Sequence, residues 1–310
     1  MNAPEIEEEN VCDCFHSLAS PLTFGTEELA LMGSQFIAIY REAIVGSPNP
    51  VRVLALVKYV PDAQFDRHID PADHRMVRSE SILSELDEYA VEAALQMKES
   101  SASGSSVVAL TMGPEAAANA VKKALQMGAD EGIHVTDEAI AGSDALATSR
   151  VLAAAIEKVG PFDVVVTGLS STDAETSIVP AQLAERLGVP LLSFATTVEF
   201  EGSTVRITRD SDAVSYVLEA DVPLVLSVTD QANEPRYPNF KGIMAAKKKS
   251  IETLSLSDLG LTADHVGVAG SKTVVVDSAE RPARVGGNVI MDDGEAGLRL
   301  AEFILAQKVL

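Results

Sequence analysis

The sequence predicts an α/β fold whose core is a doubly wound, mostly parallel sheet. Segments such as Ser106–Met112 and Asp163–Thr167 are almost continuously apolar, which is typical of strands that are covered on both faces. Between such segments, apolar residues recur at helical spacing, for example over Ser84–Glu99. Strands that alternate with helices of this length build a parallel sheet with helices on both of its faces.

The first half of this region shows the alternation most clearly, and its helix ends carry recognisable signals. Gly113-Pro114-Glu115 places a proline and an acid in a first helical turn, and Gly128 is a favourable C-terminal cap. We expect Ser143 to cap the next helix. The expected elements are, in order, the strand Val51–Tyr59, the helix Ser84–Glu99, the strand Ser106–Met112, a helix from Gly113 to Met127, the strand Gly132–Val135, the helix Ser143–Lys158 and the strand Asp163–Thr167.

After Gly188-Val189-Pro190 the hydrophobic pattern changes to shorter strands. We expect a small added β hairpin region there, because Glu201-Gly202-Ser203 is a turn sequence between strand-like runs. Pro223–Thr229 then returns to the fully apolar type, and a clear helix follows near the end of the chain. These expected elements are the strands Leu192–Phe200, Thr204–Arg209, Val214–Leu218 and Pro223–Thr229, and the helix Gly294–Lys308.

Charge and composition exclude several classes of protein. The 310 residues carry 24 basic and 46 acidic side chains, a net charge of −22, yet 46% are hydrophobic, which is too many for a disordered acidic chain. So acidic a surface disfavours nucleic-acid binding. No apolar run reaches the roughly 18 residues of a membrane helix, so we expect no stable membrane insertion. The two cysteines are too few for a disulfide framework, and we expect a cytoplasmic protein.

The chain divides into three expected parts. Residues 1–50 form an acidic extension, either flexible or upstream sequence included by a wrong start assignment, with one plausible helix around Glu27–Ile44 and a breaker cluster at 46–50. Cys12, Cys14 and His16 lie in this extension but lack the spacing of a zinc site, and we expect no metal. Residues 51–250 are expected to be the main domain and residues 251–310 a C-terminal arm that docks on another surface.

Ligands of open α/β sheets bind beyond the carboxyl ends of the strands, and three strand ends are candidates. They are Leu56-Val57-Lys58, Thr111–Pro114 and the segment Gly168–Val179. The last crowds small and hydroxylated residues ahead of a helix, so its backbone N–H groups could bind a phosphate; the alternative is an ordinary capped turn. Neither a G-x-G-x-x-G motif nor a P-loop is present, and we identify no catalytic residues, which favours a binding protein over a catalyst.

The segment Asp230–Lys249 is unusual for so acidic a protein. It is polar, restrained by prolines and closed by three lysines, and it carries the apolar residues Phe240, Ile243 and Met244. Such a segment can anchor in a partner's pocket. The alternative is that Phe240 packs back on its own domain while the lysines form a solvated face.

Two sequences in this segment, Asn233-Glu234-Pro235-Arg236-Tyr237 and Gly242–Lys249, closely resemble the signature of the electron transfer flavoprotein beta subunit family. The resemblance extends over about Val51 to Leu310. The other matching segments, which fall in the family's order and spacing, are Val53–Asp62, Asp87–Leu95, Lys123–Asp130, Gly168–Asp173 and Asp258–Leu261.

The resemblance implies an electron carrier rather than an enzyme. Members of the family pair with an alpha subunit, and the heterodimer holds one FAD mainly on the alpha side. The beta subunit has an adenine nucleotide alpha-hydrolase-like fold, usually buries an AMP and embraces alpha with a C-terminal arm. Electrons come from acyl-CoA and related dehydrogenases and leave to a membrane quinone oxidoreductase. An adenine-nucleotide-using enzyme or a nucleotide-binding stress-type protein is the rival interpretation.

The resemblance also assigns residues of the nucleotide site. This sequence departs from the family pattern at Ser84, where an asparagine is common, and at Ser177-Ile178-Val179-Pro180, where Asn-Gln-Thr-Gly is common. A branch of the family that bifurcates electrons holds a second flavin in this pocket; we favour AMP. The implied nucleotide contacts are Leu56, Ser84, Glu85, Leu86, Asp87, Met112, Gly168, Leu169, Ser170, Ser171, Thr172, Asp173, Ala174, Glu175, Thr176, Ser177, Ile178 and Val179.

Partner contacts are implied within Val228–Ser250, where Phe240 stands at the place of the family's leucine anchor. Arg209 and Asp210 match a basic–acidic pair on the flavin side of the interface, the alternative being an ordinary surface ion pair of the hairpin. The implied partner-binding residues are Asn233, Glu234, Pro235, Arg236, Tyr237, Phe240, Ile243, Met244 and Lys248.

Overall fold

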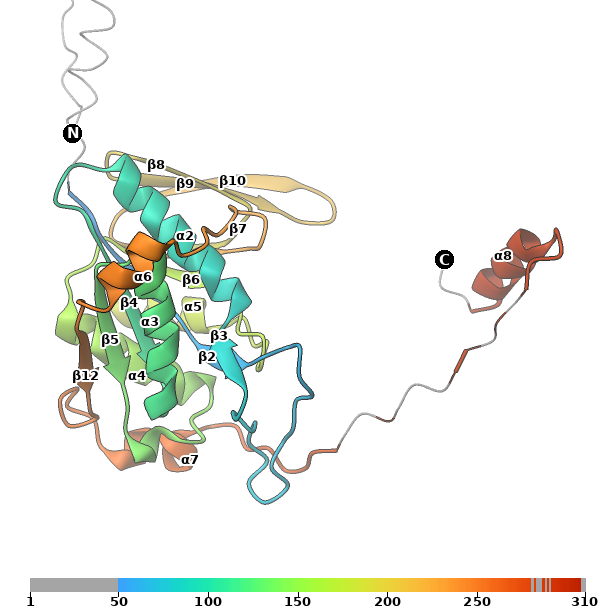
Figure 1. Ribbon diagram of the computed structural model, residues 1–310, viewed down its shortest axis with the longest axis horizontal. Helices are drawn as coiled ribbons and strands as arrows, with labels where there is room; N and C mark the ends of the chain where they lie inside the picture. Colours follow the sequence, from blue (N-terminus) through green and yellow to red (C-terminus); the bar gives the residue numbers. More distant parts are fainter. Residues whose placement is uncertain (1–49, 280–281, 283–285, 288, 290, 308–310) are drawn as a thin grey trace, which may run out of the picture.

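A computed structural model describes residues 50–279, 282, 286–287, 289 and 291–307 (Figure 1). Its centre is a sheet of seven strands in the order β12-β5-β4-β1-β6-β11-β7, in which every pair of neighbours is parallel. The predicted fold class is therefore confirmed. The helix expected around Glu27–Ile44 and the Cys12–His16 cluster lie outside the described residues.

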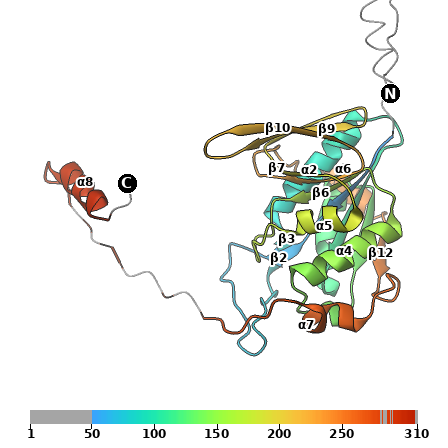
Figure 2. The same cartoon turned by 180° about the vertical axis from the view of Figure 1, so that it is seen from behind.

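The strands of the main sheet are short and buried because helices cover both faces. Figure 2 shows the second face, seen from behind. The strands are β1 (Arg52–Leu56), β4 (Ser106–Met112), β5 (Glu131–Val135), β6 (Val164–Gly168), β7 (Leu191–Ala195), β11 (Leu224–Val228) and β12 (Ile251–Leu254).

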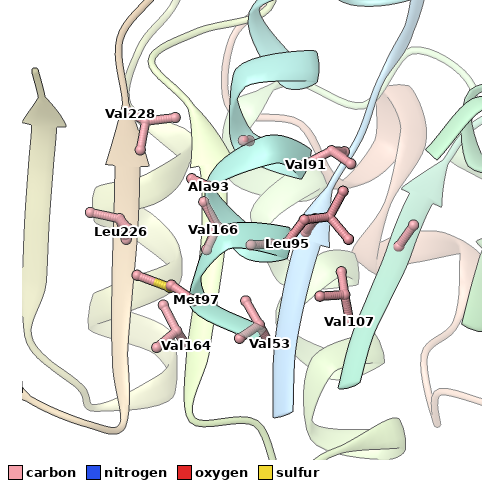
Figure 3. Close-up of a cluster of buried hydrophobic side chains, with 14 of the residues drawn as sticks. Val53, Val91, Ala93, Leu95, Met97, Val107, Val164, Val166, Leu226 and Val228 are labelled. Carbon is pink, nitrogen blue, oxygen red and sulfur yellow. The ribbon is translucent and has the colours of Figure 1, made fainter. Parts of the chain in front are cut away.

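Helices α2 (Glu85–Ser100) and α3 (Ala118–Met127) pack on one face, and α4 (Ala145–Val159) and α5 (Val179–Leu187) pack on the other. The inner side of α2 lies flat on the strands: Val91 and Met97 meet Val53 of β1 and Val164 of β6 in one buried cluster (Figure 3). Burial of these and the other apolar side chains between the layers is the main favourable contribution that holds the layers together.

The sequence-based expectation for the first strand is too long. Beyond Leu56 the chain leaves the sheet, because the N–H of Lys58 is bound by Asp87 and its carbonyl accepts the N–H of Ser84. The following residues form β2 (Tyr59–Pro61), which pairs antiparallel with β3 (Ser81–Leu83).

Leu192–Phe200 is likewise wrong as a single strand. Phe194 has a φ of 58°, and the pairing with β11 shifts register between Leu226 and Val228, so the chain turns out of the main sheet. The turn splits the segment into β7 and β8 (Thr197–Glu201). β8 joins β9 (Thr204–Asp210) and β10 (Ser215–Asp221) in a separate antiparallel sheet of three strands.

Ser143 does not cap helix α4. The cap is its neighbour Asp144, whose Oδ1 accepts the N–H of Ala147 at 2.8 Å, while the Ser143 hydroxyl accepts the N–H of Gly267 at 2.8 Å. Asp144 Oδ2 also accepts the N–H groups of Lys272 and Thr273, so both residues hold the C-terminal segment near the start of α4. The short helices η5 (Ala263–His265) and α7 (Gly267–Gly270) lie in this segment.

The C-terminal region contains one strand that sequence analysis did not expect. β12 is an edge strand of the main sheet, although residues 251–254 fall in the range expected to be an arm. The last described helix, α8 (Ala296–Ala306), lies apart from the sheet in both views (Figures 1 and 2) and exposes Leu298, Phe303 and Leu305. Among the described residues, no helix is long and apolar enough to cross a membrane.

Candidate functional site

The carboxyl edge of the sheet has a switch point between β1 and β6. From β1 the chain builds β4 and β5 on one side through α2 and α3, and α4 then carries it to β6 on the other side of β1. The connections after β1 and β6 therefore diverge to opposite faces, which leaves room for a ligand between them. Leu56, Met112 and Gly168, three of the sequence-predicted contacts, end the strands β1, β4 and β6 at this edge.

Asp87, in the first turn of α2, joins the two sides of the switch point. Its carboxylate accepts the N–H of Lys58 at 2.8 Å and also the N–H of Gly168. Burial raises the pKa of Asp87 to about 7, an effect that these N–H groups and the Lys58 charge only partly oppose. A side chain on Gly168 would lie 2.8 Å from the Leu86 carbonyl oxygen, so only glycine allows this close approach.

Asp173 is the centre of the charged network in the loop after β6. Its side chain is only 3% exposed and receives Lys58 Nζ at 2.8 Å and Arg78 Nη2 at 2.5 Å. Lys58 Nζ also reaches the Ser171 hydroxyl at 3.2 Å, and Arg67 donates to the Thr172 carbonyl at 2.6 Å. Burial raises the pKa of Asp173, but the two cations outweigh it and bring the pKa down to about 2.

The network leaves the backbone N–H groups of the loop available to a ligand. The loop residues Glu175 and Ser177 have positive φ values of 49° and 55°, a conformation found in backbone concavities that bind anions. Helix α5 begins directly after the loop without a side-chain cap. Within the described residues, the loop N–H groups that donate to no backbone carbonyl include those of Thr172, Asp173, Ala174, Thr176 and Ser177.

Ser84 contributes a second polar group at this edge. It is fully buried, its N–H donates to the Lys58 carbonyl, and its hydroxyl has no hydrogen-bond partner among the described residues. Glu85 is exposed and Leu86 half-buried beside it. A free hydroxyl, unpaired N–H groups and the α2 N-terminus fit the polar parts of a nucleotide better than an apolar ligand.

The second candidate region is the recognition segment, which we define as Asn233–Lys249. It includes helix α6 (Phe240–Ala246), which packs on α3 and is capped by Asn239. Tyr237 is 92% and Phe240 is 80% exposed, so Phe240 does not pack back on its own domain. Among the other expected partner contacts, Glu234, Met244 and Lys248 are exposed, whereas Asn233, Pro235, Arg236 and Ile243 are half-buried.

Arg209 and Asp210, at the end of β9, do not pair with each other within the described part of the chain. The Arg209 guanidinium lies 5.3 Å from the centroid of the Tyr216 ring, and Asp210 accepts the Thr196 hydroxyl at 2.8 Å. Hydrogen bonds from Ser215 and Thr196 lower the pKa of Asp210. Arg209 is therefore held half-buried by a cation–π contact rather than by a carboxylate.

Sequence analysis named Lys58 at the first strand end but did not assign it to an ion pair. It missed Arg67 and Arg78, which lie in a polar loop whose path no local pattern reveals. It also missed Glu92 and Glu99 on α2, which bind Arg236. Both residues belong to an otherwise ordinary helical pattern.

Comparison with known proteins identifies the family. A model described as the electron transfer flavoprotein domain matches residues 75–259, which include α2, the loop after β6 and the recognition segment. This chain belongs to the electron transfer flavoprotein beta subunit family. It is 40% identical over 263 residues to an electron transfer flavoprotein subunit beta of Mycobacterium bovis, covering 83% of this chain and 99% of that protein.

More distant members also align along most of the chain. The electron transfer flavoprotein subunit beta of Megasphaera elsdenii is 32% identical over 272 residues, covering 84% of this chain and 100% of that protein. The caffeyl-CoA reductase-Etf complex subunit CarD of Acetobacterium woodii is 36% identical over 242 residues, covering 77% of this chain and 92% of that protein. Membership of this family places the chain among proteins of electron transport that work with a flavin.

Proposed function

We propose that this chain is the beta subunit of a heterodimeric electron transfer flavoprotein of the cytoplasm. Together with an alpha subunit it carries electrons from acyl-CoA-type dehydrogenases to a quinone oxidoreductase and has no substrate turnover of its own. Two features occur together in this member of the family, and they support the proposal best. One is a polar cradle at the switch point, formed by the loop Ser171–Ser177 and the N-terminus of α2; the other is the exposed apolar pair Tyr237 and Phe240 on the recognition segment.

The cradle is proposed to hold AMP as a structural ligand. Backbone N–H groups of the loop Ser171–Ser177 and the N-terminus of α2 would bind the phosphate and ribose, and Leu56 and Met112 would line the floor. Main-chain contacts dominate such a site, which explains how Ser84 and Ser177 can differ from the residues common in the family without loss of the fit.

FAD is proposed to be shared with the alpha subunit, where it supplies the electron-accepting and electron-donating chemistry. The contribution of this chain is to cover the flavin and to orient the interface. Arg209 and Asp210 are the proposed flavin-side residues, because the ring of Tyr216 and the hydroxyl of Thr196 hold them in place on β9. The segment after Ser271, with the exposed apolar residues of α8, is the proposed arm that packs on alpha.

One alternative has a specific observation in its favour. The relative CarD is named as a subunit of a caffeyl-CoA reductase-Etf complex, and this chain covers 92% of it. The second candidate is an electron-bifurcating subunit with a second FAD in the cradle, because the resemblance includes a branch that holds a second flavin there and has a Thr and a Val near Thr176 and Val179 of this loop. The two candidates make opposite predictions about the ligand that fills the cradle.

Co-expression with the alpha subunit encoded by the same organism tests the proposal. We expect a yellow heterodimer that releases one FAD and one AMP on denaturation. Two FAD and no AMP would replace the main proposal by the bifurcating alternative. A chain that stays monomeric and colourless with its alpha subunit, while binding an adenine nucleotide alone, would support the stress-type interpretation instead.

A further inference from the structure

The recognition segment has an outer and an inner side with different chemistry. The outer side carries Tyr237 and Phe240, which project into solvent. The inner side carries Arg236, the residue directly before Tyr237, whose guanidinium points toward α2. The sequence predicts that Arg236 binds a partner; in the structure its guanidinium donates to two carboxylates of its own chain.

Arg236 makes a two-carboxylate clamp with helix α2. Its Nε and Nη2 donate to the two oxygens of Glu92 at 2.7 and 2.9 Å, and its backbone N–H donates to Glu92 Oε2 at 3.2 Å. Its Nη1 and Nη2 donate to the oxygens of Glu99 at 2.5 and 3.0 Å. A planar guanidinium that faces two carboxylates in this way is fixed in direction as well as in position.

Glu92 is the more buried of the two carboxylates, and it requires the pairing with Arg236. Glu92 is only 4% exposed and lies among the buried residues of α2. Burial raises the pKa of Glu92, but the hydrogen bonds and charge of Arg236 outweigh it and lower the pKa below its ordinary value. A buried carboxylate needs a partner of this kind, because an unpaired charge in the interior is strongly unfavourable.

Three further contacts place the rest of the segment on α2, on α3 and on the residues just after α3. Asn233 Nδ2 donates to the Tyr89 carbonyl at 3.0 Å, ahead of the clamp. Beyond it, a Cβ on Gly242 would lie 2.7 Å from the Gln126 carbonyl oxygen, so α6 approaches the end of α3 as closely as a backbone can. Lys249 Nζ donates to the Ala129 carbonyl at the end of the segment. Phe240 thus lies between these contacts, at the start of α6, which packs beside α3 (Figure 1).

We propose that Arg236 is a positioning residue, which holds the recognition segment in its binding conformation before any redox partner arrives. This inference rests on the proposed function, because it assumes that Tyr237 and Phe240 meet a dehydrogenase. A segment that is already ordered loses little conformational entropy on binding, and a transient electron carrier benefits from such preorganisation. The residue acts through Phe240 and Tyr237 and makes no contact with the partner.

The test compares variants of the full-length chain, alone and co-expressed with its alpha subunit. Arg236→Gln removes the planar guanidinium and leaves the Glu92 carboxylate without its cation. The double variant Glu92→Gln/Arg236→Gln removes both charges of this pair. Glu99→Gln removes only the outer, exposed carboxylate. Arg236→Lys keeps the charge without the planar fork. The matched control is Arg206→Gln, which breaks the exposed pair of Arg206 with Glu219 on the three-stranded sheet.

Two measurements test whether Arg236 positions the recognition segment. Amide hydrogen exchange across α6 should accelerate by about tenfold or more in Arg236→Gln and in the double variant, and less in Glu99→Gln and Arg236→Lys. With the acyl-CoA dehydrogenase that reduces the wild-type heterodimer, KM for the heterodimer should rise about tenfold in Arg236→Gln while kcat and flavin content stay unchanged. Arg206→Gln should change neither measurement.

Unchanged exchange across α6 in Arg236→Gln and in the double variant would overturn the inference, whatever the kinetics. A KM that rises in Phe240→Ala but not in Arg236→Gln would also overturn it while leaving the proposed function intact. If instead Phe240→Ala and Arg236→Gln both leave KM unchanged, the recognition segment is not the partner-binding surface, and the proposed function loses that part of its support.

Discussion

The carboxylate of Asp87, in the first turn of α2, accepts a hydrogen bond of 2.8 Å from the backbone N–H of Lys58, just beyond β1. The same carboxylate binds the N–H of Gly168 at the end of β6. One side chain thus fixes the spacing of two neighbouring strand ends on either side of the switch point. It does so from a buried position, where a negative charge is unfavourable.

Asp87 should therefore give protein stability an unusual pH dependence. Its pKa of about 7 in the folded chain lies above the unfolded value of 3.8, so the folded state binds more protons between these values. This contribution to the free energy of unfolding is complete below pH 3.8 and is lost as the pH rises to 7. The full effect is on the order of 4 kcal/mol.

Urea unfolding of wild type and Asp87→Asn at pH 4 to 8 measures this contribution, because the asparagine does not titrate. The difference in free energy of unfolding, wild type minus variant, should fall from pH 4 to pH 7 and then level off. Asp163→Asn is the matched control, since Asp163 accepts the N–H of Arg52 at the opposite end of β1. A difference that rises with pH would show that Asp87 is ionised in the folded state throughout.

Asp173 should have the opposite pH dependence. Its pKa of about 2 lies below the unfolded value of 3.8, so its stabilisation is present above pH 3.8 and is lost as the pH falls toward 2. Asp173→Asn should lower the free energy of unfolding at pH 7 by up to about 2 kcal/mol, and this loss should shrink in acid. Asp66→Asn, in an exposed position of the loop between β2 and β3, is the control.

The same variant also tests the cradle. Asp173 holds Lys58 and Arg78, and with them the loop after β6, so its replacement should lower the AMP content of the purified heterodimer. Full AMP content in Asp173→Asn, together with unchanged stability, would mean that the loop conformation does not depend on this network.

Much of the fold could be predicted from the sequence because buried strands and amphipathic helices carry local signals. Ser106–Met112 was predicted residue for residue, and the helix end at Gly128 agrees with its positive φ of 142°. The division of Leu192–Phe200 between two sheets could not be predicted, because the turn at Phe194 depends on pairing with β11. β12 was missed because Ile251–Leu254 is too short and too polar to resemble a central strand.

The candidate site could be predicted less completely. The loop Gly168–Val179 was found from its composition and its position after a buried strand. Its charged network could not be found, because Arg78 reaches Asp173 from a loop 95 residues earlier in the chain. The role of Arg236 was similarly hidden, since Glu92 lies 144 residues before it and has no distinctive local pattern. Long-range pairs of this kind follow only from the assembled fold.

Asp144 provides a test of how the C-terminal segment is held. Its Oδ1 caps α4, while its Oδ2 accepts the N–H groups of Lys272 and Thr273 at 2.7 and 2.9 Å. Asp144→Ser should keep the cap and lose the second set of contacts, whereas Asp144→Ala should lose both and destabilise the chain by about 1 kcal/mol. Trypsin should cut after Lys272 several-fold faster in both variants.

The comparison of the two variants separates the two roles. Asp137→Ser is the control, because Asp137 caps the short helix η4 (Glu138–Ile140) through the N–H of Ala139. If Asp144→Ser is cleaved at the wild-type rate, the contacts with Lys272 and Thr273 do not hold the start of the arm.

Phe240 is the residue on which the proposed electron transfer most directly depends. Its ring is 80% exposed at the first position of α6, so its loss removes almost no packing within this chain. Phe240→Ala should raise KM for the heterodimer with the acyl-CoA dehydrogenase by about tenfold or more, as expected for an aromatic anchor in a partner's pocket. Flavin content and thermal stability should stay at wild-type values, and Phe240→Leu should give an intermediate KM.

Phe65→Ala, at another exposed phenylalanine, is the size-matched control for Phe240→Ala. Equal loss of flavin and of electron transfer in Phe240→Ala would instead place this ring at the contact with the alpha subunit.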